Sequence, residues 1–134
     1  MTRGARYLYA GLAWAFVAGL VVQVFFIGLG LFAGSENTEL HVTLGWILHL
    51  VPILILVVAA VARAGRRQIM LAAALAVTVF IVPILPALRA DFPVLAALHP
   101  VGALLAFLLA IIVARGATEL IRGSDEDLGA ARPA

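Results

Sequence analysis

Three histidines are the residues of this sequence whose type and position could support chemistry. His41 and His49 lie in the segment HVTLGWILH, and His99 lies in LHPVGALLAF, so each is at or near the start of a long apolar run. An imidazole is costly to place in a bilayer without a partner, which makes a histidine in an apolar run a candidate functional residue. The chain has no cysteine, which excludes disulfides and thiolate chemistry.

The spacing of His41 and His49 places them on one side of a helix. Eight residues of α-helix correspond to a rotation of roughly 80° and a rise of about 12 Å. Gly45 lies midway, four residues from each histidine. This pattern predicts a bare glycine surface between two imidazoles, against which a flat ligand could lie close to the backbone.

The composition predicts an integral membrane protein. Of 134 residues, 65% are hydrophobic and only 12% are charged, which is too little charge to cover the surface of a soluble domain. The net charge of +2 comes from arginine alone. We therefore expect the lipid bilayer, and no nucleic acid, as the surroundings of this chain, with the basic residues setting its membrane topology.

The apolar runs predict an all-α, antiparallel bundle of four transmembrane helices over residues 1–116, because short polar turns join them. The expected spans are residues 7–33, 39–62, 68–88 and 93–114. Pro83 and Pro86 are expected to kink or loosen the end of the third span. The remaining residues, 117–134, are expected to form a cytoplasmic tail that begins as an amphipathic turn and fades into disorder.

The arginines predict the orientation of the bundle. Eight of the nine lie in the N-terminal head, the 63–67 loop and the tail, whereas the two opposite turns hold only Arg89 together with acidic residues. The positive-inside rule then places both termini in the cytoplasm. The bias toward Ala, Val, Leu, Gly and Arg suggests a bacterial source, and therefore the bacterial inner membrane.

Alternate helices of a four-helix bundle face each other diagonally, so His41 and His99 are expected to meet across the core. Two neutral imidazoles on opposite sides of a plane are the axial ligands of a b-type haem, and we expect one haem per chain. Gly45 and Gly102 follow these histidines by four and three residues and would leave room for the porphyrin. Arg89 is a candidate partner for a propionate.

Two further polar residues leave alternatives open. His49 could replace His41 as the ligand, bond to a propionate or a helix carbonyl, or be satisfied by packing. Gln23, the only strongly polar residue in the first span, could form an interhelical hydrogen bond or contact a bound ligand.

Bis-histidine ligation leaves no open position on the iron, which favours one-electron transfer or haem handling over catalysis. A quinone or a redox protein is the expected partner. The alternatives are a cofactor-free accessory protein that forms homo-oligomers through its glycine-rich first span, a Zn or Cu site of three histidines, and a small transporter.

Three motifs carry a resemblance to known proteins: VQVFFIGLGLF in the first span, LHVTLGW in the second and AALHPVGALLAFLLA in the fourth. The chain resembles an uncharacterised family of small four-span bacterial membrane proteins of actinobacterial type. More distantly, over residues 7–116, it is similar to one four-helix half of haem A synthase and to other b-type cytochromes. The resemblance implies His41 and His99 as paired ligands. That synthase half has a glutamate three residues before its first histidine, where this chain has Thr38, so the synthase reaction is not implied.

Overall fold

Four long helices make up the structure, a computed structural model that describes the backbone of residues 2–130 and the side chains of residues 3–123. They are α1 (Thr2–Phe32), α2 (Thr38–Val61), α3 (Gly65–Ile81) and α5 (His99–Ala130), and no strand occurs among the described residues. Four helical segments are long and apolar enough to cross a membrane. The predicted all-α, four-helix membrane bundle is confirmed.

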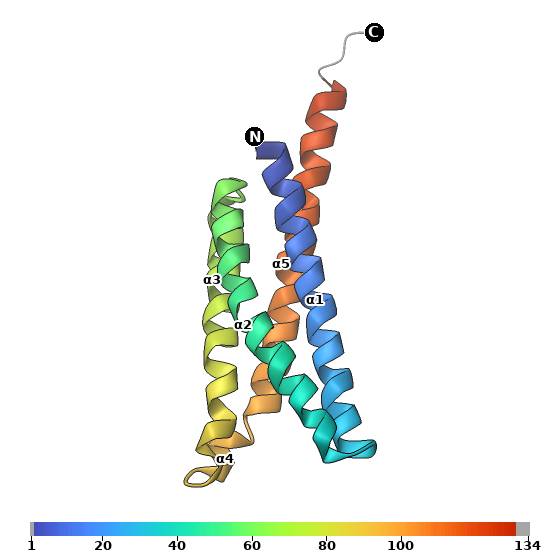
Figure 1. The fold of residues 1–134 in the computed structure, drawn as a ribbon. Coiled ribbons are helices and arrows are strands. Elements are labelled where there is room, and N and C mark those ends of the chain that lie inside the picture. The colour runs from blue at the N-terminus through green and yellow to red at the C-terminus, as the bar shows by residue number, and fades with distance from the viewer. Residues whose placement is uncertain (1, 131–134) are drawn as a thin grey trace.

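Short elements join these helices. The 3-10 helix η1 (Ser35–Asn37) connects α1 to α2, and the 3-10 helix η2 (Val82–Arg89) and the short helix α4 (Pro93–Ala96) connect α3 to α5. The helices run alternately up and down, so the start of α1, the α2–α3 loop and the end of α5 share one end of the bundle (Figure 1). We call the opposite end, which carries η1, η2 and α4, the turn end.

The packing order places α2 and α5 on a diagonal. Both α1 and α3 pack against α2 and against α5. The fully buried side chains include Tyr9, Phe16, Ile55, Leu75 and Val113, one or two from each long helix. Close packing of this kind is the main force that holds helices together in lipid, where the hydrophobic effect between helices is weak.

Helix α2 bends midway along its length and diverges from α3 toward the turn end (Figure 1). Pro52 lies inside this helix and is buried. A proline has no N–H to donate to the carbonyl four residues earlier and its ring pushes that carbonyl away, so it accounts for the bend. The bend separates the turn-end half of α2 from α3.

The third span loosens where the sequence predicted. The α-helix α3 ends at Ile81, and the chain continues as the 3-10 helix η2, which contains Pro83 and Pro86. Neither proline can donate the i to i−4 hydrogen bond of an α-helix, so the tighter 3-10 winding replaces it.

The prediction for the C-terminal segment is wrong for residues 117–130, which continue α5 as a helix rather than forming an amphipathic turn that fades into disorder. Ala117 is buried and Leu120 and Ile121 pack against the core, so apolar packing extends past the fourth predicted span. Thr118 also accepts a hydrogen bond of 3.1 Å from the indole nitrogen of Trp14 on α1. Residues 131–134 of the expected tail lie outside the described residues.

A buried polar contact fixes the end of the bundle that carries the start of α1. Gln68 of α3 is 6% exposed, and its side-chain oxygen accepts a 3.1 Å hydrogen bond from the hydroxyl of Tyr9 on α1. A Cβ atom at Gly116 of α5 would overlap the amide group of Gln68. Gly116 is therefore the residue that lets α5 approach this hydrogen-bonded pair.

Replacing Gly116 with alanine should destabilise the bundle, because Gln68 must move and lose its bond to Tyr9. We expect the free energy of unfolding to fall by about 1 kcal/mol or more. The matched control is Gly11→Ala, because a Cβ atom at Gly11 meets nothing within 4 Å. Unfolding by SDS in mixed micelles, followed by circular dichroism, measures both. Equal stability of the two variants would contradict this role for Gly116.

Candidate functional site

A cavity of about 240 Å³ lies between the four long helices in the half of the bundle toward the turn end. All three histidines line it, together with Gln23 and otherwise apolar residues. The remaining lining residues are Leu20, Val42, Gly45, Trp46, Leu48, Val79, Val82, Pro83, Ala103 and Ala106. The predicted placement of His41 and His49 on one side of a single helix is confirmed, since both face this cavity.

His41 and His99 meet across the bundle. His41 lies in the first turn of α2, and His99 is the first residue of α5. Their ring centroids are 6.3 Å apart and the ring planes are inclined by 78°. The predicted diagonal pairing of these two histidines is thus found in the structure.

Each ring of this pair is held by a main-chain carbonyl. The Nδ1 atom of His41 lies 3.0 Å from the carbonyl oxygen of Gln23, and Nδ1 of His99 lies 2.9 Å from that of Val82. A carbonyl oxygen can only accept a hydrogen bond, so each Nδ1 must carry the proton and donate it. In the neutral rings, Nε2 then keeps its lone pair, as a metal ligand or a proton acceptor requires.

The sequence explains why the carbonyl of Val82 is available. In an α-helix this oxygen would accept from the residue four positions later, which is Pro86 and has no N–H. His99 supplies the donor instead, from 17 residues further along the chain. The carbonyl of Gln23 lies inside α1 and has a second lone pair beyond the one used by the helix. Both histidines thus donate to carbonyl lone pairs that the α-helical hydrogen bonds do not use.

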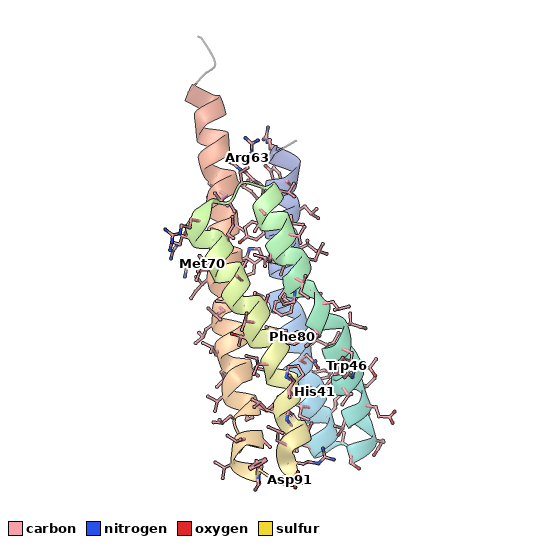
Figure 2. The ribbon with its side chains drawn as sticks, turned by 90° about the vertical axis from the view of Figure 1, so that its left-hand side faces the viewer. His41, Trp46, Arg63, Met70, Phe80 and Asp91 are labelled. Atoms are coloured by element: carbon pink, nitrogen blue, oxygen red, sulfur yellow. The ribbon has the colours of Figure 1, made fainter. Side chains whose placement is uncertain are left out.

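His49 lies at the inner end of the cavity among aromatic rings. Its ring centroid is 5.0 Å from that of Phe80 and 5.9 Å from the Trp46 ring. Figure 2 shows Trp46 on α2 and Phe80 on α3, both further from the turn end than His41. Nδ1 of His49 and the side-chain oxygen of Gln23 are buried without a hydrogen-bond partner among the described residues. The expectation that Gln23 forms an interhelical hydrogen bond is therefore not met by this oxygen.

Two of the six predicted site residues do not line the cavity. Gly102 faces the side chain of Val82, since a Cβ atom there would come within 2.6 Å of a Val82 methyl group. Arg89 donates a 3.4 Å hydrogen bond to the carbonyl of Pro86 and is exposed at the turn end. Gly45 does line the cavity, and a Cβ atom on it would come 2.9 Å from the amide nitrogen of Gln23.

The three histidines do not form one metal site. Within the described part of the chain, no group of three histidine or carboxylate side chains is close enough to hold one ion. His49 is stacked on Phe80, away from the His41–His99 pair. The Zn or Cu site of three histidines therefore finds no support in this arrangement.

Sequence reasoning missed the residues that come from the loosened third span. Val82 supplies the carbonyl that holds His99, and Pro83 and Val79 form part of the cavity wall. One signal was present: Pro86, four residues after Val82, removes the α-helical donor to the Val82 carbonyl. Nothing in the sequence indicated that His99 would be the residue to reach it.

Residues 23–88 match the model of DUF6220, a family of unknown function. The matched segment begins at Gln23 and includes His41, His49 and Val82, but it ends before His99 and α5. The chain matches no curated protein and no solved structure. The similarity thus covers the cavity residues from Gln23 to Pro83, but not Leu20 or the residues of α5, and it leaves the function open.

We expect His41 and His99 to carry their protons on Nδ1, because both bonds end on carbonyl oxygens. Nitrogen-15 NMR of histidine-labelled protein, at a pH where the rings are neutral, should show protonated Nδ1 and unprotonated Nε2 for both residues. The control is Gln23→Leu, which keeps the main-chain carbonyl and should leave the His41 signals unchanged. A proton on Nε2 of either neutral ring would rule out the assigned bond.

Proposed function

We propose that this protein binds one b-type haem between α2 and α5, with His41 and His99 as the axial ligands. The observation that supports this most is the pairing of two imidazoles whose Nδ1 atoms are both anchored on carbonyls. Second-shell bonds of this kind orient histidine ligands and raise their basicity in metalloproteins. They leave two Nε2 lone pairs on opposite helices beside a single cavity.

The spacing of the rings supports the same proposal. With metal–nitrogen bonds of about 2 Å, and each nitrogen about 1.1 Å from its ring centroid, two imidazoles on opposite sides of one ion have centroids roughly 6 Å apart. The separation of 6.3 Å between His41 and His99 agrees with this value. His49 lies outside this pair, which favours His41 as the ligand from α2.

The cavity would enclose only part of a porphyrin. Its volume of about 240 Å³ lies below the roughly 300–1,000 Å³ of pockets that bury a whole ligand. Trp46 at the wall is 67% exposed, so the rest of the macrocycle would lie against lipid beside it. No arginine lines the cavity, so the propionates would need partners outside it, at the polar turn end where Arg89 lies.

When bound, a haem in this position would supply one-electron redox chemistry. If His41 and His99 both held the iron, no position would remain open on it, so the proposed role is electron transfer or haem handling rather than catalysis. The residues of the chain would hold and orient the group. A membrane quinone or a redox protein would exchange electrons with it.

Substitution of the histidines tests the proposal. Detergent-purified protein supplied with haem should show a sharp reduced α-band in a reduced-minus-oxidised spectrum. His41→Ala and His99→Ala should each abolish this band or weaken haem binding by about 100-fold, because each removes an axial ligand. His49→Phe is the matched control and should keep the band, since it preserves the stacking on Phe80.

Two results would contradict the proposal. Loss of the band in His49→Phe but not in His41→Ala would move the ligand from α2 inward by two turns. A wild-type protein that stays colourless after haem is added would leave a cofactor-free accessory protein, in which the His41–His99 contact joins two helices.

We further propose that the end of the bundle carrying the start of α1 faces the cytoplasm of a bacterium, in its inner membrane. The support is charge: Arg3, Arg6 and the 63–67 loop lie at this end, whereas Arg89 lies at the turn end with Glu36, Glu39 and Asp91. Basic residues in short loops are retained on the cytoplasmic side.

Reporter fusions in a bacterial host test this orientation. A fluorescent protein fused after Ala134 should fold and fluoresce, because it stays in the cytoplasm. Alkaline phosphatase inserted after Glu36 should be active, because it reaches the oxidising outer side. The reverse pattern would overturn the assignment.

A further inference from the structure

Two buried polar atoms beside the cavity have no hydrogen-bond partner among the residues that the structure describes. They are the side-chain oxygen of Gln23 on α1 and Nδ1 of His49 on α2. A buried polar atom without a hydrogen bond is unfavourable by about 1–3 kcal/mol. Both residues line the same cavity, so a molecule bound there is placed to supply a missing hydrogen bond.

The chemistry of the two atoms restricts what that group can be. An amide oxygen only accepts hydrogen bonds, so Gln23 requires a donor, whereas Nδ1 of His49 accepts or donates according to its tautomer. The edge of a b-type haem carries methyl, vinyl and propionate groups and offers no hydroxyl donor. A ligand that satisfies the Gln23 oxygen must therefore bring a hydrogen-bond donor of its own, such as a hydroxyl group.

The walls select a flat and mainly apolar molecule. The His49 ring makes tilted contacts with the rings of Phe80 and Trp46, and the surrounding residues are aliphatic, including Leu20, Leu48 and Val79. The inner end of the cavity, whose whole volume is about 240 Å³, would hold one substituted six-membered ring and leave the space between His41 and His99 to the edge of the porphyrin. Val42 and Trp46 are 51% and 67% exposed on a membrane-spanning helix, so the ligand would enter from the lipid.

We propose that the inner end of the cavity binds the head group of a lipid-soluble hydroquinone. One hydroxyl donates to the side-chain oxygen of Gln23, and the ring lies beside His49 and its aromatic neighbours. The oxidised quinone binds more weakly, because its oxygens only accept and leave the Gln23 oxygen unpaired. This inference rests on the proposed function only in naming its membrane partner, because the binding itself needs no haem.

The test is isothermal titration calorimetry of the full chain in nanodiscs with tetramethylhydroquinone, after subtraction of partitioning into empty discs. Its dimethyl ether is the matched ligand control, since it keeps the ring and lacks the hydroxyl donors. We expect saturable binding of the hydroquinone, with the ether and the corresponding quinone weaker by on the order of tenfold, the loss of one good hydrogen bond.

Variants locate the binding. Gln23→Leu and His49→Phe should each weaken the hydroquinone by on the order of tenfold. Thr78→Val is the matched control, because the Thr78 hydroxyl bonds to the carbonyl of Ala74 within α3 and does not line the cavity.

The outcomes separate this inference from the haem proposal. Saturable hydroquinone binding by protein that takes up no haem would support the inference and overturn the haem proposal. A haem spectrum without hydroquinone binding would do the reverse. Equal binding of the hydroquinone and its ether, or full binding by Gln23→Leu, would overturn the inference and leave water as the partner of the two buried atoms.

Discussion

Every polar group inside a bilayer must find its partner within the protein, and this constraint shapes the turn end of the bundle. The prolines of η2 remove backbone donors, and His99 returns a donor to the carbonyl of Val82. The same bond joins the first residue of α5 to the first residue of η2, so that α5 begins beside the end of α3. His41 forms the matching bond to α1. The same two hydrogen bonds therefore give the carbonyls a donor and fix the orientation of the two imidazole rings.

One half of the bundle is closely packed, and the other half contains the cavity. At the end that carries the start of α1, Gly116 allows close approach to the hydrogen-bonded pair of Tyr9 and Gln68, and this half holds most of the fully buried side chains. Toward the turn end, Pro52 bends α2 away from α3, and the cavity lies between them. Packing is looser there, and the three histidines and Gln23 face the open space. Sites that bind ligands are commonly built in such less tightly packed regions.

Much of the architecture followed from local properties of the chain. Hydropathy predicted four spans, and the prolines predicted the loosened end of the third. The diagonal meeting of His41 and His99 followed from bundle topology. Gly102 and Arg89 were placed at the site by their distance along the sequence, but the side chain of Val82 occupies the space beside Gly102, and Arg89 bonds to its own 3-10 helix. The distance along the sequence sets the position of a residue along the helix axis, but it does not determine toward which neighbouring helix its side chain points.

The sequence by itself determined the membrane class, the spans, the antiparallel order and the residues capable of chemistry, because these depend on composition and on the fixed pitch of a helix. The tertiary structure decided which carbonyls hold the imidazoles and therefore which ring nitrogen is left free. It also decided that the Gln23 oxygen and Nδ1 of His49 are buried without partners. These features depend on how α1, α2, η2 and α5 are rotated against one another. That rotation is set by the packing of many similar apolar side chains. The order of these side chains along the sequence does not specify the rotation.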